Sequence, residues 1–287
     1  MMHYQKVSGI LNNNGMNLYR GCTHGCIYCD SRSKCYRINH DFEDVLVKEN
    51  AIELLETALK KKRKKCMIGT GSMTDPYCHA EDVAQMTRKS LEVIYKYGFG
   101  VNIITKSTKL LHDLDLLKKI NEKAKAVVDV TLTTDDEELC KKLEPHVSTT
   151  RERYEMLKTL RDNHIPTIVW LSPILPFIND TEENISAILD ACIDAKVYGI
   201  LCFGMGLTLR EGNREYFYQN LERHFPGLKE KYIRTYGNNY SIISPNQNRL
   251  MKIFTDKCKS GNIETDIKKL FAFMHHLPEK TAQLTLF

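Results

Sequence analysis

The sequence predicts an α/β fold, a partial (β/α)6 barrel of the TIM type that is followed by a helical extension. Short apolar runs alternate with helical patterns over residues 1–209, which is typical of βα units around a parallel sheet. Polar residues of ligand-binding types directly follow several of these runs. An open, doubly wound sheet would give the same alternation and stays an alternative at this point.

Six apolar runs are expected to form the strands, at residues 16–20, 66–70, 101–105, 126–133, 166–174 and 199–203. Between these runs, apolar residues recur at the spacing of one helix face. The clearest case joins Ile185, Ile188, Leu189, Cys192 and Ile193, at positions i, i+3, i+4, i+7 and i+8. On the same grounds we expect helices at 42–62, 83–94, 110–121, from 148 onward and 185–193.

The rest of the chain has a different pattern. Aromatic residues within 216–225 suggest a helix that ends at Pro226, and apolar residues within 267–274 predict a last helix. We therefore predict three parts: a barrel over 1–209, a helical extension over 210–276 that packs on the barrel, and a flexible tail over 277–287.

Composition limits the class of protein. The chain has 287 residues, a net charge of +5 and ten cysteines that do not form the framework of a small secreted domain. It has no apolar stretch as long as a membrane span, and residues 1–15 lack the apolar core of a signal peptide. We expect a cytoplasmic protein with no membrane association, since free thiols need a reducing compartment. The basic charge permits a phosphate-bearing substrate.

Three cysteines stand close together in a glycine-containing loop. Cys22, Cys26 and Cys29 have the spacing C-x3-C-x2-C, and thiolates are the usual ligands of iron–sulfur clusters. Three thiolates can hold three irons of a cubane cluster, which leaves the fourth iron open to a small molecule. A structural zinc site with Cys35 is the alternative. Zinc sites usually pair their cysteines in two knuckles, however, and Cys35 stands single.

Further polar residues follow the ends of the predicted strands. They are the turn 72–75, Lys106, Thr133 and Ser172. In barrels of this type, active residues lie at the carboxyl ends of the strands. Because the cysteine loop also follows a strand, we expect these residues to share one site.

The cysteine spacing resembles that of the radical S-adenosylmethionine (SAM) superfamily. Within it, segment 19–29 is similar to the spore photoproduct lyase family, the "DNA repair photolyase" branch. Other similar segments keep the order of that family, at 71–77, 104–107, 149–153, 172–180 and 225–237. The resemblance implies a [4Fe-4S] cluster on the three cysteines, SAM on its open iron, and a 5′-deoxyadenosyl radical that abstracts hydrogen from the substrate. It also implies a flavodoxin or ferredoxin as reductant and DNA as a partner.

The resemblance further suggests which residues contact SAM. Tyr28 would pack beside the adenine. Thr74 and Asp75 would meet the amino group, with Ser72 in the same turn, and Lys106 would hold the carboxylate. Simple loop packing of Tyr28 and a turn-forming role of Asp75 are the structural alternatives.

Two more pairs are suggested in the same way. Thr131 or Thr133 would offer a hydroxyl to the ribose or methionine part of SAM. Arg151 and Arg153, near a predicted helix start, could bind a carboxylate or phosphate. Solvated surface arginines are the alternative.

Two positions depart from the family. The lyase uses a cysteine as hydrogen donor in the segment that matches 71–75, where this chain has Ser72, and a tyrosine where this chain has Asp30. Cys78 or Cys66 could replace the donor. We therefore expect a nucleic-acid repair or modification reaction other than spore photoproduct repair. The alternatives are a radical SAM enzyme acting on a peptide, RNA or small metabolite, and a non-catalytic, zinc-bound module.

Residues 283–287 resemble the pentapeptide that binds the bacterial DNA sliding clamp. Such motifs place a glutamine and apolar side chains in a preformed pocket; here these are Gln283, Leu284, Leu286 and Phe287. The resemblance implies the sliding clamp as a partner, and a short apolar tail without a partner is the alternative.

Overall fold

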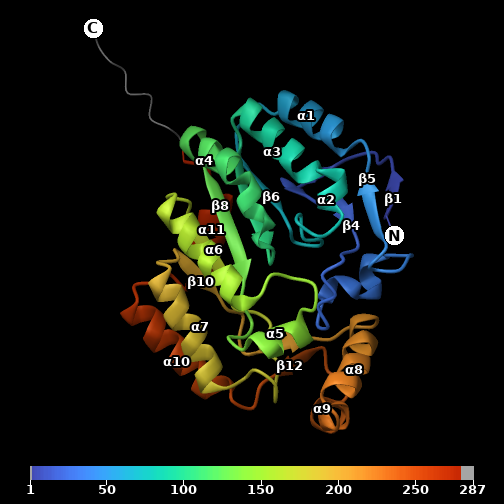
Figure 1. Cartoon of the computed structure of the whole chain (residues 1–287), viewed down its shortest axis with the longest axis vertical. Coiled ribbons are helices and arrows are strands. Elements are labelled where there is room, and N and C mark those ends of the chain that lie inside the picture. Colours follow the sequence, from blue (N-terminus) through green and yellow to red (C-terminus); the bar gives the residue numbers. More distant parts are fainter. Residues whose placement is uncertain (1, 279–287) are drawn as a thin grey trace.

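A computed structural model describes residues 2–278 of the chain. Its centre is a seven-stranded sheet with the order β10-β9-β8-β7-β6-β3-β2. The six strands from β10 to β3 are parallel, and β2 is the antiparallel partner of β3. The sheet is open, with β10 and β2 as its two edge strands; Figure 1 shows β8 of this sheet with α4 and α6 beside it. This confirms the predicted partial barrel. The strand bounds are β2 (Leu11–Asn12), β3 (Gly15–Met16), β6 (Met67–Thr70), β7 (Gly100–Thr105), β8 (Ala126–Thr131), β9 (Thr167–Trp170) and β10 (Gly199–Leu201).

Two smaller sheets flank the central one. The first has the order β1-β5-β4, from β1 (Met2–Gln5), β5 (Val45–Lys48) and β4 (Tyr19–Arg20). The second pairs β11 (Gly206–Thr208) with β12 (Ser241–Ile243). The predicted strand 16–20 is thus wrong in part, because its two ends belong to different sheets.

The expected helix 42–62 is also partly wrong. Its first residues form strand β5, in which Val45, Leu46 and Val47 are all buried between β1 and β4. Pairing with both neighbours favours the β-branched residues as a strand. The helix itself begins at Ala51.

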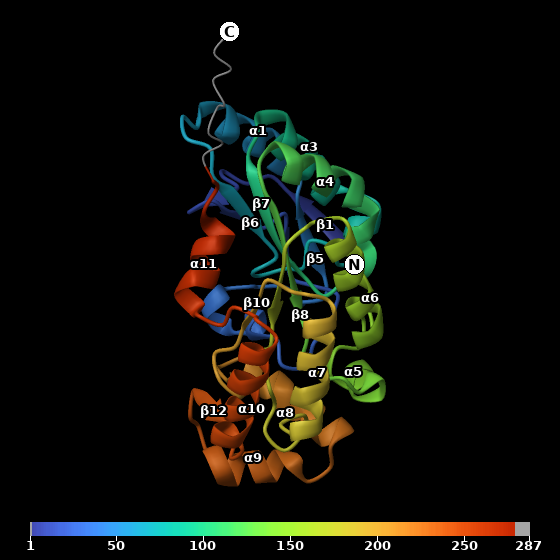
Figure 2. The same cartoon turned by 90° about the vertical axis from the view of Figure 1, so that its left-hand side faces the viewer.

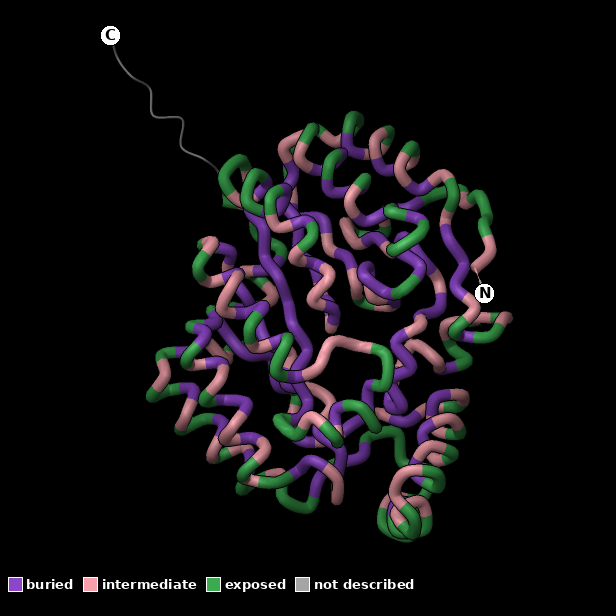
Figure 3. The backbone as a smooth tube through the Cα atoms, in the orientation of Figure 1, coloured by how far each residue is buried: buried purple, intermediate pink, exposed green. Residues whose placement is uncertain are grey.

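Amphipathic helices cover the outer face of the central sheet. They are α1 (Ala51–Lys61), α3 (Met86–Tyr97), α4 (Leu114–Lys123), α6 (Thr150–Asp162) and α7 (Glu182–Asp194). Each turns buried residues to the sheet and exposed ones to solvent (Figure 3). Helix α6 starts with a capping box, in which Thr149 and Glu152 satisfy each other's backbone amides.

Helix α11 (Ile267–His275) lies on the other face of the sheet (Figure 2). Leu270 and Met274 pack against Met67, Val127 and Ile168 and fill one end of the concave face. This leaves the end at the carboxyl termini of the strands as the place for a site. Helix α10 (Gln247–Ser260) packs against α7.

The cysteine loop is covered by a second apolar cluster. It brings Ile27 and Tyr28 together with Phe217 of α8 (Asn213–His224), Tyr232 of α9 (Leu228–Tyr236) and Ile242 of β12. Two short helices complete this region, α2 (Glu81–Ala84) and α5 (Glu137–Leu143), with three 3-10 turns, η1 (Asp30–Arg32), η2 (Lys34–Tyr36) and η3 (Thr108–Asp113).

Two further observations concern partners. Within residues 2–278, no helix is long and apolar enough to cross a bilayer. The clamp-like residues Gln283, Leu284, Leu286 and Phe287 lie outside the described residues.

Candidate active site

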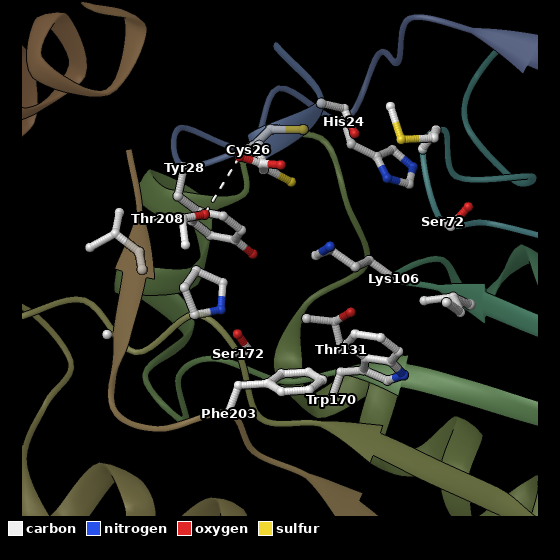
Figure 4. A pocket seen from close by; sticks show the side chains of 18 of the residues that line it. His24, Cys26, Tyr28, Ser72, Lys106, Thr131, Trp170, Ser172, Phe203 and Thr208 are labelled. Atoms are coloured by element: carbon white, nitrogen blue, oxygen red, sulfur yellow. Dashed lines mark hydrogen bonds between the residues drawn. The ribbon is translucent and has the colours of Figure 1, made fainter. Parts of the chain in front are cut away.

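A cavity of about 560 Å³ lies at the carboxyl ends of the parallel strands. Side chains from the cysteine loop, from the ends of β6 to β9 and from the segment after β10 line it (Figure 4). All three predicted ligand cysteines, Cys22, Cys26 and Cys29, are among them. The structure therefore brings the cysteine loop and most of the predicted strand-end residues together around one cavity.

The cysteine loop is held by its backbone. Gly21 has φ +83°, and a Cβ there would lie 2.4 Å from the carbonyl oxygen of Phe42. The next residue, Cys22, donates its N–H to that same oxygen at 2.8 Å, and Ile27 donates to the carbonyl of Leu143 at 3.0 Å. Only glycine allows this close approach.

The three thiols lie in an environment that keeps them protonated in the absence of metal. Burial raises the pKa values of Cys26 and Cys29. A hydrogen bond with Cys78 and burial together raise the pKa of Cys22. Since metal ligation requires thiolates, loading of the site releases protons.

The donor set fits an iron–sulfur cluster better than a zinc ion. Among residues 2–278, no group of three or more His, Cys, Asp or Glu side chains is arranged around a single metal ion. Cys35 is exposed, and its Sγ accepts a hydrogen bond from Arg210 at 3.3 Å outside the cavity. Three thiols on the wall of a 560 Å³ cavity instead leave room for a group larger than one ion.

Lys106 follows β7 and lines the cavity with the cysteines. Burial by itself would lower the pKa of Lys106, but Cys26, Glu144 and Asp75 outweigh it and raise this pKa. Its Nζ lies 5.9 Å from the centroid of the Tyr28 ring. The site therefore holds one ammonium group that is available to a carboxylate.

Asp75 lines the cavity but also holds together the strand ends around it. Its carboxylate accepts hydrogen bonds from the Lys106 backbone N–H at 2.8 Å, the Thr105 hydroxyl at 2.8 Å and the Tyr77 N–H at 2.9 Å. The turn is tight because Gly71, at φ +97°, passes so close to Ile104 that a Cβ would lie 2.0 Å from its carbonyl oxygen. The Asp75 carboxylate thus makes the turn contacts of the structural alternative. It also lines the cavity in which the contact with SAM is predicted.

Tyr28 belongs to a buried polar network. Its hydroxyl donates to Glu144, and the same carboxylate forms an ion pair with Arg153. The pKa of Tyr28 is raised by burial and by the charge of Glu144. This network fixes the phenol ring in the cavity wall.

The structure corrects the role expected of Arg153 and Thr133. Arg153 has no exposed surface and does not line the cavity, because its guanidinium is taken up by Glu144 and by the carbonyl of Thr131 at 2.7 Å. Thr133 is buried behind the cavity, with its hydroxyl 3.5 Å from Glu144. Arg151 is exposed on the outer side of α6 and does not line the cavity.

The remaining predicted contacts divide into two groups. Ser72 and Thr131 line the cavity. Thr74 does not, and its hydroxyl donates to the carbonyl of Tyr19 at 3.3 Å.

Neither candidate hydrogen donor lines the cavity. Cys78 is a fully buried free thiol that shares a hydrogen bond with Cys22, and it does not line the cavity. Cys66 precedes β6, at the opposite end of the strand from the site. Among the residues that line the cavity, the thiols are those of Cys22, Cys26 and Cys29.

Sequence reasoning missed several residues of the site. His24 is buried in the cavity wall with its Nδ1 3.5 Å from Asp75, and burial lowers its pKa. Trp170 and Phe203 lie across the cavity from His24 and Cys26 (Figure 4), and Gln247 also lines the cavity. The position of His24 within the cysteine loop was the one signal available for it.

A family profile and several known proteins match this chain. The profile of the radical SAM superfamily matches residues 16–219. An uncharacterized protein of Mycobacterium tuberculosis is 29% identical over 227 residues, which is 77% of this chain and 66% of that protein. An uncharacterized protein of Methanocaldococcus jannaschii is 34% identical over 58% of this chain and 62% of its own length. The radical SAM Nα-GlyT isomerase of Pseudomonas phage M6 is 25% identical over 55% of this chain and 32% of its own length.

Solved structures show the same fold at low sequence identity. A variant of spore photoproduct lyase with bound AdoMet and dinucleoside spore photoproduct superposes with a TM-score of 0.63 at 12% identity, over 90% of this chain and 79% of that one. The methyltransferase TsrM of Kitasatospora setae, with tryptophan substrate and a SAM analog, gives a TM-score of 0.54 at 14% identity, over 85% of this chain and 51% of that one.

Proposed function

Since the chain belongs to the radical SAM superfamily, we propose that it is an enzyme that binds a [4Fe-4S] cluster through Cys22, Cys26 and Cys29 and SAM beside it. We propose a nucleic acid, DNA in the first place, as the substrate from which hydrogen is abstracted. The observation that carries the proposal is the meeting of three thiols with one half-buried ammonium group, Lys106, in a single cavity at the strand ends.

When bound, the cluster and SAM supply one-electron cleavage of a C–S bond and hydrogen-atom abstraction. The chain supplies position. Lys106 would hold the SAM carboxylate, with its backbone fixed by Asp75. Tyr28, fixed by Glu144, would form the wall beside the adenine. The cavity walls would limit the access of water and other reactive groups to the reacting atoms.

The choice of DNA has two supports. The chain is basic, with a net charge of +5. Its fold is that of spore photoproduct lyase, which was solved with a dinucleoside photoproduct. The chain spans about two thirds of its mycobacterial relative, so any further activity of a whole protein of that kind stays a proposal. A flavodoxin or ferredoxin is the proposed reductant.

Anaerobic reconstitution tests the cofactor assignment. The protein loaded with iron and sulfide and reduced with dithionite should convert SAM to 5′-deoxyadenosine, measured by mass spectrometry. Cys26→Ala should lose the cluster and the product, whereas Cys35→Ala, outside the cavity, should keep both. A fully loaded cluster that forms no deoxyadenosine would overturn the proposal.

Isotope tracing tests the substrate class. Deuterium from labelled DNA should appear in the deoxyadenosine. If label transfers only from RNA, a peptide or a small metabolite, the choice of DNA is wrong while the cofactor assignment stands.

A further inference from the structure

We propose that Trp170 and Phe203 form a stacking site for a nucleobase of the substrate, and that Asp129 positions the indole ring. This inference rests on the proposed function, because it names how that same cavity would recognise its substrate.

The two rings form one wall of the cavity. Trp170 is the last residue of β9, and Phe203 lies two residues beyond the end of β10. Their ring centroids are 5.8 Å apart, at an interplanar angle of 53°. Figure 4 shows them on the opposite side of the cavity from Cys26, with Lys106 between. A flat group held there would face the cofactor end of the cavity.

Phe203 is unusually exposed for its position. Its side chain is 55% exposed although it lines a cavity and has aromatic neighbours. Phe271 of α11, which does not line the cavity, has its ring centroid 6.4 Å from that of Trp170 and 6.4 Å from that of Phe203. Phe203 is thus supported by aromatic neighbours and still largely exposed, so that a base can stack on it.

The indole ring of Trp170 is held in place by a hydrogen bond at its nitrogen. Its Nε1 donates to Asp129 at 3.2 Å, and the other oxygen of Asp129 accepts from Asn102 at 2.9 Å. Asp129 is fully buried. A buried polar network of this kind fixes a ring orientation, and Asp129 is therefore a positioning residue.

The surroundings of the two rings suit a neutral heteroaromatic ring. The charged residues that line the cavity are Asp30, Asp75 and Lys106, which belong to the cysteine loop or to the strand ends beside it. The cavity wall also offers uncharged hydroxyl and amide groups, from Ser172, Thr208, Ser241 and Gln247. Such groups bind base edges without burying a charge.

Fluorescence provides a direct test, because Trp170 is the one tryptophan of the 287 residues. A mixed-sequence single-stranded DNA oligomer, added to the anaerobic, SAM-saturated holoprotein, should quench the indole emission in a saturable way. An abasic oligomer of equal length carries the same phosphates and should not. Phe203→Ala should weaken binding of the base-containing oligomer about tenfold, and Phe203→Tyr, which keeps an aromatic ring and adds no second indole, should restore it.

Tyr4→Ala removes an aromatic side chain of similar exposure, 54%, outside the cavity, and serves as the matched control. The positioning role of Asp129 is tested without oligomer. The emission maximum of Trp170 should differ between Asp129→Asn and the wild type. The inference is overturned if the abasic oligomer quenches equally, if Phe203→Ala binds like Tyr4→Ala, or if SAM alone accounts for the quenching. Deoxyadenosine formation is measured in the same proteins without oligomer. If deoxyadenosine forms but the base-dependent quenching is absent, the stacking site is wrong and the proposed cofactor chemistry stands.

Discussion

At the scale of single residues, Arg153 shows how a charge can serve the site without touching it. It forms a fully buried ion pair with Glu144, and Glu144 in turn holds the hydroxyl of Tyr28. Burial opposes the charge of Glu144, but Arg153 and Lys106 outweigh it and lower the pKa of this carboxyl. The ion pair therefore stabilises the wall of the cavity through Tyr28.

Replacement of Arg153 should be severe. Arg153→Ala would leave the carboxylate of Glu144 buried without its partner, so we expect a loss of about 3–5 kcal/mol in the free energy of unfolding. Urea unfolding monitored by circular dichroism measures it. Arg151→Ala, on the exposed side of the same helix, should change stability by no more than about 0.5 kcal/mol. Equal midpoints for the two variants would contradict the assigned role.

Asp129 should make stability depend on pH. Burial raises its pKa to about 7, against hydrogen bonds from Asn102 and Trp170 that favour the charged form. Between about pH 4 and pH 7 the folded protein would keep a proton that the unfolded chain loses, so stability falls as the pH rises through this window. The slope is at most about 1.4 kcal/mol per pH unit.

The free energy of unfolding is measured from pH 4 to pH 8. Its decrease with rising pH should be smaller in Asp129→Asn than in the wild type. Asp256→Asn, at an exposed position of α10, should leave the slope unchanged. If wild type and Asp129→Asn show parallel curves, Asp129 does not titrate in this range.

At the scale of elements, the cysteine loop depends on helix α8. The guanidinium carbon of Arg32, in η1, lies 4.3 Å from the ring centroid of Phe42 and 3.7 Å from that of Tyr216. Arg32 also pairs with Glu43. The guanidinium of Arg32 thus stacks between two rings, of which Phe42 precedes β5 and Tyr216 belongs to α8. This stacking connects the loop to both elements.

We therefore expect Arg32→Lys, which keeps the charge but loses the planar stack, to release iron to a chelator several-fold faster than the wild type. Loss of the cluster absorbance with time is the measurement. Lys34→Ala breaks only an exposed pair with Glu211 in the neighbouring turn, and should release iron at the wild-type rate. Equal rates for all three proteins would show that the stack does not hold the loop.

The elements differ in how well the sequence specifies them. The parallel strands are short apolar runs between helical patterns, and all six predicted runs contribute to the central sheet. Helix α10 was not expected, because its buried residues, Leu250, Phe254 and Cys258, form a narrow stripe among polar ones. The apolar spacing within 42–62 predicts helix also for the residues of β5, because only pairing with β1 and β4 makes this segment a strand.

At the scale of the whole molecule, topology explains which site residues could be predicted. Ser72, Asp75, Lys106 and Thr131 follow or end adjacent parallel strands, so they meet at one edge of the sheet. The sequence predicts Trp170 within a strand. Only the folded sheet shows that this strand ends at Trp170 and that Trp170 lines the cavity. Glu144 has no local signal, since its partner Tyr28 is 116 positions away in the chain.

At the molecular scale we also propose a partner for residues 283–287, which lie outside the described part of the chain. Their resemblance to the clamp-binding pentapeptide leads us to propose that the bacterial sliding clamp recruits the enzyme to DNA. The motif offers one amide, from Gln283, and the apolar side chains of Leu286 and Phe287. Contacts of this kind act as anchors in a preformed pocket.

The double variant Gln283→Ala/Leu286→Ala should therefore weaken binding to an immobilised sliding clamp by at least tenfold, measured by surface plasmon resonance, because it removes both the polar and an apolar anchor. Thr281→Ala, just before the motif, should bind like the wild type. Deoxyadenosine formation should be the same in all three proteins, since the cavity is built from residues 22–247. Wild-type protein that fails to bind the clamp would contradict this partner and leave the chemistry at the strand ends untouched.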